Sequence, residues 1–211
     1  MTTEASTVTI TFEDLPSGTA LGSQYSGVAF GNAVILSSGI ALNEFEFPPH
    51  SGSNTASDVG GPMTITFTSP LQIFGGRFTY SVPVTIQAYD SSGNLLASAT
   101  SRFSNNEALS GVAGSQPNEL LTLSSPAGIA KLVLTGSGGG TSFTLDDMTV
   151  STVSRCDLNQ DGVTNVTDVQ RIVNEVGATP ATDDLNGDSR IDSLDIQLVV
   201  TSALGSVCAA K

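Results

Sequence analysis

Two twelve-residue segments of this chain carry oxygen-bearing side chains at the same spacing, 27 residues apart. They span residues 157–168 and 184–195. Positions 1, 3, 5, 9 and 12 are Asp157, Asn159, Asp161, Asn165 and Asp168 in the first segment and Asp184, Asn186, Asp188, Asp192 and Asp195 in the second. Calcium is a hard cation that takes six to eight oxygen ligands, and a tight loop can present alternate side chains to one ion. The spacing therefore predicts two calcium loops.

This spacing is that of the EF-hand loop, in which the backbone carbonyl of position 7 is a further ligand. Position 7 is Val163 in the first loop and Arg190 in the second. Position 6 must turn sharply, which Gly162 does without steric cost, whereas Ser189 would be strained at positive φ. We therefore expect the second loop to bind calcium more weakly or in a distorted form. The alternative is a pair of acidic turns that bind no metal, which the repetition of the pattern disfavours.

Each loop leads into apolar residues at helical spacing. They are Val169, Ile172, Val173 and Val176 after the first loop, and Ile196, Val199, Val200 and Leu204 after the second. Gly177 and Gly205 are expected to end the two helices. Units this short cannot each bury a core alone, so we expect the two apolar stripes to pack against each other.

Residues 156–208 resemble a type I dockerin, a module of two calcium loops, each followed by one helix, with Asp at position 12. The resemblance implies a small all-α module with two EF-hand-type loop–helix repeats, two bound Ca²⁺ ions and a cohesin module as partner. The recognition residues of the family lie at loop positions 10 and 11, which are Val166, Thr167, Ser193 and Leu194 in this chain. The two pairs differ, which argues against a symmetric, two-way binding mode. The alternative partner is the β domain of the same chain.

The only two cysteines bracket this module. Cys156 directly precedes the first loop and Cys208 follows the second helix, and the ends of a two-repeat fold lie close together. We therefore predict a disulfide rather than two independent thiols. The first residues lack the basic and apolar regions of a signal peptide. Together with the calcium loops, this predicts the mature part of an exported protein, secreted or on the cell surface, rather than a cytosolic one.

The chain is strongly acidic, with 20 acidic residues against 7 basic ones and a net charge of −13. An excess of this size argues against nucleic acid and against an anionic membrane surface as partners. No apolar run reaches the length of a transmembrane helix, so we expect no membrane insertion.

The first 150 residues are rich in Ser, Thr and Gly and show the alternation of strands. The expected strands are 7–12, 28–30, 33–36, 64–68, 74–80, 84–89, 95–100, 120–123, 131–135 and 142–145. Eight to ten short strands separated by Gly and Pro turns predict a β-sandwich, specifically a jelly roll. The predicted fold class is therefore mostly β, with a β-sandwich domain at 1–153 and the dockerin-like module at 154–211.

The β domain resembles jelly-roll carbohydrate-binding modules and, more loosely, the β-sandwich domains of exported bacterial proteins with a sorting tail (PEP-CTERM-like). Residues 12–18 and 143–147 carry the second resemblance. They contain two acidic pairs, Glu13-Asp14 and Asp146-Asp147. Because the first and last strands of a jelly roll often lie side by side, these carboxylates could converge, and they would repel unless a cation sits among them. This is a candidate third calcium site; the alternative is ordinary strand-end acids facing water.

Signals for a sugar site or for catalysis are sparse. Sugar platforms use exposed aromatic rings, yet the chain has no Trp and only three Tyr. Residues 43–52 are the most chemically varied segment and could line a binding loop. His50 is the only histidine, no G-x-S-x-G motif accompanies it, and no catalytic residue is predicted. We therefore expect a non-catalytic, exported calcium-binding protein whose β domain contacts a glycan or surface. The alternative is a small enzyme of the glycoside hydrolase type that carries a dockerin.

Overall fold

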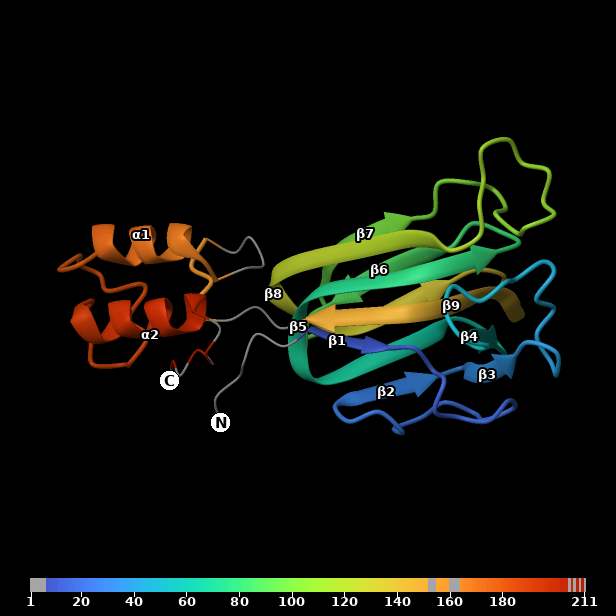
Figure 1. Cartoon of the computed structure of the whole chain (residues 1–211), viewed down its shortest axis with the longest axis horizontal. Helices are drawn as coiled ribbons and strands as arrows, with labels where there is room; N and C mark the ends of the chain where they lie inside the picture. The colour runs from blue at the N-terminus through green and yellow to red at the C-terminus, as the bar shows by residue number, and fades with distance from the viewer. Residues whose placement is uncertain are drawn as a thin grey trace. The chain divides into compact units, whose positions relative to one another are not determined.

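The computed structural model describes residues 7–151, 155–159, 164–204, 206, 208 and 210 (Figure 1). The chain divides into two compact units. One comprises Val8–Val150 and is called the β unit; the other is built around Ser151–Lys211 and is called the C-terminal unit. The predicted domain boundary between residues 153 and 154 lies outside the described residues.

The β unit is a nine-stranded antiparallel sheet, which confirms the mostly β prediction. The strands are β1 (Thr7–Ile10), β2 (Val28–Gly31), β3 (Ala33–Ser37), β4 (Asn54–Val59), β5 (Met63–Tyr80), β6 (Thr85–Tyr89), β7 (Leu95–Thr100), β8 (Glu119–Thr135) and β9 (Gly140–Ser151). Their order is β3-β4-β9-β5-β8-β6-β7, with β1 paired to β9 and β2 to β5. The jelly-roll connectivity stays a prediction.

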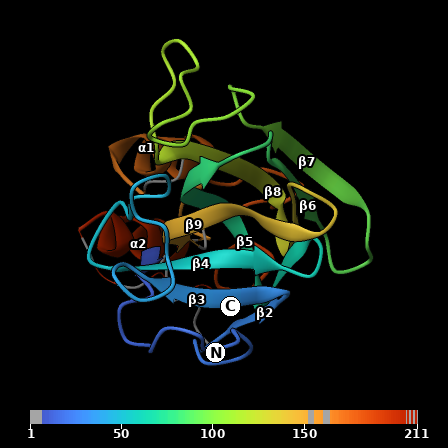
Figure 2. The same ribbon diagram turned by 90° about the vertical axis from the view of Figure 1, so that its right-hand side faces the viewer.

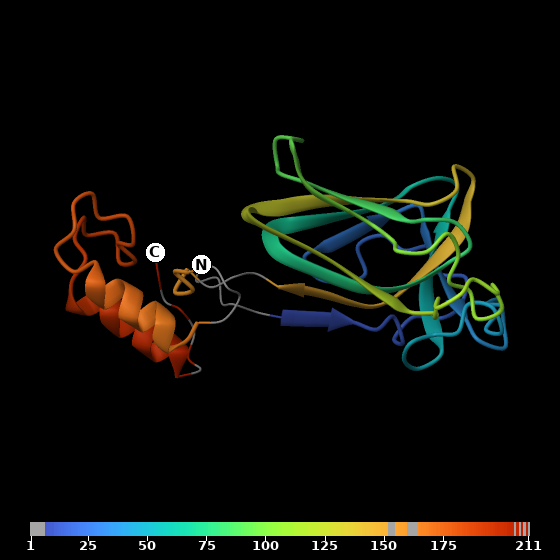
Figure 3. The same ribbon diagram turned by 90° about the horizontal axis from the view of Figure 1, so that it is seen from above.

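Two long strands, β5 and β8, fold this sheet over itself. Residues 63–66 of β5 pair with 131–134 of β8, and residues 73–78 pair with 119–124, while the register is irregular between Thr66 and Ile73. Figures 1 and 3 show both strands bending in this region, so that the sheet forms two layers. Alternate residues such as Met63, Ile65 and Phe67 face the space between the layers and are buried, as the period of a strand requires.

Four of the predicted strands proved to be two. Residues 64–68 and 74–80 belong to the single strand β5, and 120–123 and 131–135 to the single strand β8. The two strands continue through the irregular stretch between the predicted segments instead of ending there. Strand β4 was not predicted, because its sequence is polar. Its side chains Asn54, Ser57 and Asp58 are nevertheless buried.

The C-terminal unit contains two helices, α1 (Val166–Asn174) and α2 (Ser193–Ala203). Asn165 and Asp192 cap their N-termini, and in each case the third helical residue returns a bond to the cap, forming a capping box. The helices share one small core, but the predicted apolar stripes enter it only in part. Ile172 and Val199 are buried there, whereas Val173, Val176 and Leu204 are exposed. The core contains Cys156, Leu158, Ile172, Leu185, Ile191, Val199 and Cys208. Neither helix has the length and apolar character needed to cross a membrane in the part of the chain that is described.

Candidate functional site

The second loop is turned around the carboxylate of its first residue, Asp184. This carboxylate accepts hydrogen bonds from the backbone N–H groups of Gly187, Asp188 and Ser189 at 2.8, 3.3 and 2.7 Å. Desolvation raises the pKa of Asp184, but these N–H donors outweigh it and hold the pKa below its ordinary value. The loop therefore favours an ionised carboxylate at the position where a calcium ligand is predicted.

The carboxylate of position 12 closes both loops in the same way. Buried Asp195 accepts from the N–H of Asn186 at 3.1 Å and of Asp192 at 2.9 Å, which are positions 3 and 9 of its loop. Buried Asp168 accepts from the N–H of positions 3 and 9 of the first loop at 3.0 and 2.9 Å. The two repeats thus share not only a spacing but also a hydrogen-bond network.

Ser189 adopts the conformation that position 6 demands. Its φ is 71°, in the left-handed region that glycine enters freely and other residues enter at a cost on the order of 1 kcal/mol or more. The bond from its N–H to Asp184 helps to hold it there. The second loop therefore closes in spite of the missing glycine.

The donor set of the second loop consists of oxygen atoms alone. Carboxylates and amide oxygens suit Ca²⁺, whereas zinc prefers nitrogen and sulfur. The residues would be Asp184, Asn186, Asp188, Asp192 and Asp195, with the carbonyl of Arg190. Among the described residues no three His, Cys, Asp or Glu side chains already converge as a metal cluster. Asp161 and Val163 of the first loop lie outside the described residues.

Positions 10 and 11 of both loops are solvent-exposed. Val166 is 75% exposed and Leu194 55%, and Thr167 and Ser193 are exposed as well. The Thr167 hydroxyl donates to Asn165 Oδ1 at 2.9 Å, so the residue that caps α1 also holds the Thr167 side chain in place. The first turns of α1 and α2 therefore present two different pairs of side chains to solvent.

The predicted disulfide is confirmed. Cys156 and Cys208 are bonded, with their Cα atoms 5.8 Å apart, and both are buried in the core of the C-terminal unit. The bridge ties the start of the first loop to the residues that follow α2, and it closes a segment of 52 residues.

In the β unit, the two acidic pairs hold one segment of backbone, residues 50–54. Glu13 accepts from the N–H groups of Ser53 and Asn54 at 3.0 and 2.7 Å. Asp146 accepts from those of His50 and Ser51 at 2.7 and 3.0 Å. Both carboxylates are therefore used to anchor this loop, and the calcium site suggested for them stays a prediction.

The second member of each pair has a side-chain partner. Asp14 accepts from the Tyr25 hydroxyl at 2.7 Å; burial, and then this bond, raise the pKa of Tyr25. Asp147 accepts from Ser51 Oγ at 2.7 Å and lies 2.5 Å from His50 Nδ1. The serine hydroxyl thus donates to the carboxylate and not to the imidazole, which is not the arrangement of a serine nucleophile.

Buried Asn106 has a structural role that sequence analysis missed. Its Oδ1 accepts from the Tyr80 N–H at 2.7 Å, and its Nδ2 donates to the carbonyls of Phe78 and Gln116 at 2.9 and 3.0 Å. The bonds to Tyr80 and Phe78 fasten the loop 101–118 to the end of β5. An Asn in a polar loop is ordinary in sequence, so no pattern could have shown its burial.

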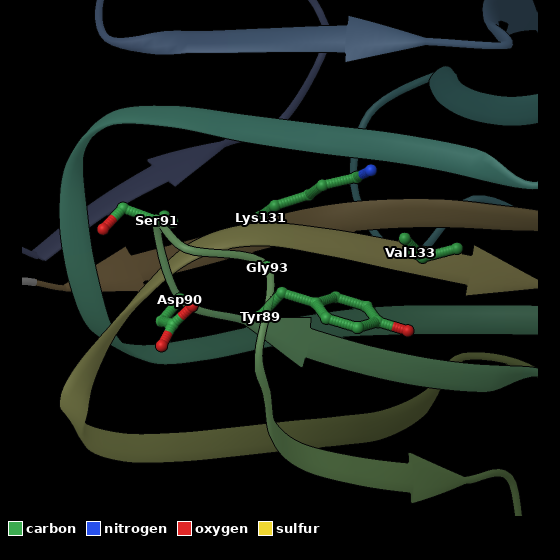
Figure 4. Close-up of a pocket in the computed structure, with 7 residues that line it drawn as sticks. Tyr89, Asp90, Ser91, Gly93, Lys131 and Val133 are labelled. Carbon is green, nitrogen blue, oxygen red and sulfur yellow. The ribbon is translucent and has the colours of Figure 1, made fainter.

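A groove of about 420 Å³ lies over β6, β8 and the turn after β6. Its lining residues are Tyr89, Asp90, Ser91, Gly93, Ala130, Lys131 and Val133. Figure 4 shows the Tyr89 ring and the Lys131 side chain extending in the same direction. The Asp90 carboxylate is hydrogen-bonded within the turn, where it accepts from the backbone N–H groups of Ser92 and Asn94 at 2.9 and 2.8 Å. The groove is large enough for a small ligand or one or two sugar rings.

Comparison with known proteins identifies part of the chain. Residues 155–204 match the family described as the dockerin type I domain. No curated protein matches the chain. Structures similar in fold include the K2 cleaved adhesin domain of Lys-gingipain (13% identity, 69% of this chain and 99% of that chain covered, TM-score 0.44). Two others are a family 6 carbohydrate-binding module (15%, 63% and 92%, 0.36) and CsCBM6-3 of Clostridium stercorarium in complex with cellobiose (20%, 63% and 92%, 0.34). Residues 155–204 are therefore similar to type I dockerin domains.

Proposed function

We propose that this is an exported, non-catalytic protein whose C-terminal unit binds calcium and docks onto a cohesin module. The observation that carries the proposal is the shared network of the two loops, which leaves positions 10 and 11 of both repeats exposed at the helix starts. Dockerin domains in general bind calcium and cohesins, and they occur on secreted or cell-surface proteins.

Calcium would be held by the ligand positions of both loops. Without the ion, the carboxylates of one loop repel each other, so the free energy of calcium binding adds to the free energy of folding. The left-handed Ser189 strains the second loop, and we expect that loop to bind more weakly than the first. The two carboxylates of position 12 are already fixed by backbone N–H groups, which limits the reorganisation that binding requires.

The docking surface would be one-sided. Leu194 is an exposed apolar residue, whereas its counterpart in the first loop is the polar Thr167. A partner that fits one pair would fit the other poorly, so we propose a single orientation of the complex. The competing partner is the β unit of the same chain.

A charge at Leu194 tests the docking role. Leu194→Asp should abolish capture of a purified cohesin while leaving calcium affinity unchanged, because Leu194 is exposed and is not at a ligand position of the loop. Leu204→Asp is the matched control: it places the same charge on the same unit, at a residue that is 82% exposed beyond the end of α2. Equal capture by both variants and the original chain would refute docking through this face.

For the β unit we propose binding of a glycan or a glycan-covered surface, without catalysis. The support is a rigid sheet that carries an open groove and, at one end, loops fastened by buried polar side chains. Binding of the full chain to a panel of immobilised polysaccharides, neutral and acidic, tests this part. Retention by none of them would count against it.

A further inference from the structure

The loops at one end of the β unit expose three large apolar side chains, Ile40, Phe45 and Leu109, of which Phe45 and Leu109 lie next to a hydrogen bond that joins the two loops. Phe45 is 75% exposed and Leu109 72%, whereas six other phenylalanines of the chain are buried. Phe45 lies in the loop 38–53 between β3 and β4, and Leu109 in the loop 101–118 between β7 and β8. Figures 1 and 2 show that both loops lie at the same end of the sheet. A single exposed apolar residue is unremarkable, but two on adjoining loops require an explanation.

Hydrogen bonds between the loops bring these residues together. The Ala108 N–H donates to the carbonyl of Glu46 at 3.0 Å. Phe45 and Leu109 each lie one residue from this bond, on neighbouring stretches of backbone. A second bond, from Asn118 Nδ2 to the carbonyl of Pro48 at 3.1 Å, joins the same two loops further along. The stretches of backbone that carry Phe45 and Leu109 are therefore neighbours.

Both loops are held rigidly on the sheet. Asn106 fastens the loop 101–118 to β5 through two side-chain hydrogen bonds and bonds across the loop to Gln116 through a third, and Glu13 and Asp146 fasten the end of the loop 38–53. Because the backbone is ordered by folding, a ligand would not have to meet that entropy cost on binding. A binding site needs a rigid apolar surface of this kind, whereas a loop that only faces solvent does not.

The same two loops carry three glutamates, each within two residues of Phe45 or Leu109 in the sequence. Glu44, Glu46 and Glu107 each accept one hydrogen bond, from Gly39 N–H, Asn43 Nδ2 and Asn105 Nδ2 at 3.3, 2.7 and 2.8 Å. Each carboxylate can accept several bonds, so acceptor capacity remains for hydroxyl donors. The two loops carry these three acids against one basic residue, Arg102. Anionic ligands would be repelled, whereas a neutral ligand rich in hydroxyl groups would be complementary.

We propose that Phe45 and Leu109 form the platform for a pyranose ring of a neutral glycan, with the carboxylates of Glu44, Glu46 and Glu107 accepting from its hydroxyls. This inference rests on the proposed glycan-binding function of the β unit and assigns its site. The ring of Phe45 offers an apolar face to the C–H groups of the sugar. An exposed pair of this size matches one or two sugar rings and falls short of the roughly 800 Å² per partner that a stable protein interface buries.

Calorimetry of the full chain with cellohexaose, xylohexaose and mannohexaose tests the assignment. At least one should bind, and Phe45→Ala should weaken that binding at least about 10-fold, because the apolar area of the ring is lost. Leu109→Ala should have a smaller effect. Leu95→Ala, at an exposed apolar residue of β7 outside both loops, is the matched control and should bind like the original chain. Tyr89→Ala, which removes the ring of the groove over β6 and β8, tests that groove as the other candidate site. Since Phe45 is exposed, its replacement should leave the melting temperature of the β unit unchanged.

The other possible results distinguish an error in the proposed site or ligand class from a failure of the proposed glycan function. If Tyr89→Ala loses binding and Phe45→Ala keeps it, the glycan function stands and the groove is the site. If the original chain binds polygalacturonate but no neutral hexasaccharide, the function stands and the ligand class proposed here is wrong. If it binds neither, the glycan function of the β unit fails. If Phe45→Ala instead converts a dimer to a monomer in solution, the occupant of the platform is a second copy of the chain, and the proposal is overturned.

Discussion

The two units of the molecule are stabilised in different ways. The β unit packs 27 buried apolar residues into one core between the layers of its sheet. In the described part of the C-terminal unit the core has seven, two of which are the bonded cysteines. A core that small cannot offset the conformational entropy of some 50 residues, so such modules depend on disulfides or metals. The β unit is therefore stabilised mainly by packing, whereas the C-terminal unit depends on its disulfide and its loops.

Buried polar side chains hold backbone segments in place in both units, but only those of the C-terminal unit occupy equivalent positions of a sequence repeat. In the C-terminal unit Asp168 and Asp195 close the loops from equivalent positions of a repeat. In the β unit Asp58 accepts from the N–H groups of Ser142 and Phe143 at 2.7 and 3.0 Å, and Asn106 fastens a loop. These β-unit residues come from unrelated places in the chain, and each satisfies backbone groups that would otherwise be buried without partners.

Removal of the disulfide should give the largest effect and should be confined to one unit. In the variant with both Cys156→Ala and Cys208→Ala, the free energy of unfolding of the C-terminal unit should fall by about 4 kcal/mol, because the unfolded chain regains the entropy of a 52-residue loop. The two units can be followed separately in denaturant: helical circular dichroism reports on the C-terminal unit. All three tyrosines lie in the β unit, so their fluorescence reports on that unit. An equal loss in both signals would contradict the comparison.

Removal of calcium should destabilise the same unit by a smaller amount. At a free calcium concentration a few hundred times the dissociation constant, binding contributes roughly 3 kcal/mol, and chelation should lower the melting temperature of the helical signal alone. Asp157→Ala should cost more than Asp184→Ala, because the second loop already carries the strain of Ser189. Asp183→Ala, next to the second loop but outside its ligand positions, serves as control. A melting curve that does not respond to chelation would rule out calcium as a stabiliser.

For the C-terminal unit the sequence predicted the two helices and the disulfide, because the chemistry of the repeat constrains their positions. A loop that surrounds one ion needs oxygens at fixed spacing and a left-handed residue at position 6, and Ser189 takes that conformation even without being glycine. The cysteine pair followed from the same reasoning, since the ends of a two-repeat fold meet. The metal itself is a prediction that follows from these positions.

For the β unit the sequence predicted the class of fold but not its construction. Alternation identified most strands, yet β4 was missed because it buries Asn54, Ser57 and Asp58. Strands β5 and β8 were each predicted as two strands, because the sequence pattern did not distinguish a bend within a strand from a gap between two strands. Phe45 was noted only as part of a varied segment, since its exposure depends on how two distant loops meet. Packing of this kind is a property of the tertiary structure, and local patterns do not encode it.

Loss of the Asn106 side chain should destabilise the β unit and not the C-terminal unit, which is the reverse of the result expected when the disulfide or calcium is removed. Asn106→Ala leaves the N–H of Tyr80 and two carbonyls without their partner, and it should destabilise the β unit by about 2–3 kcal/mol. The tyrosine signal should shift and the helical signal should not. Asn105→Ala is the matched control; its side chain bonds only within its own loop, to Glu107, and its loss should cost less than about 1 kcal/mol. Equal costs for the two variants would show that Asn106 does not fasten the loop.

The smallest effect is expected at alkaline pH, and it should also distinguish the units. Burial, followed by the hydrogen bond that the Tyr80 hydroxyl donates to Glu119, raises the pKa of Tyr80 from 10.0 to about 12. Below pH 10 the hydroxyl is protonated in both the folded and unfolded chains, so its contribution to stability is complete. Between pH 10 and about 12 the unfolded chain loses this proton while the folded chain keeps it, so the free energy of unfolding of the β unit should fall as the pH rises. The C-terminal unit contains no tyrosine and should lack this dependence. Burial and the bond to Asp14 also raise the pKa of Tyr25, which adds to the same slope, so Tyr80→Phe should reduce the slope without abolishing it. A β unit whose stability is constant over this range, or a Tyr80→Phe variant with the original slope, would show that the buried Tyr80 hydroxyl is not what ties its stability to pH.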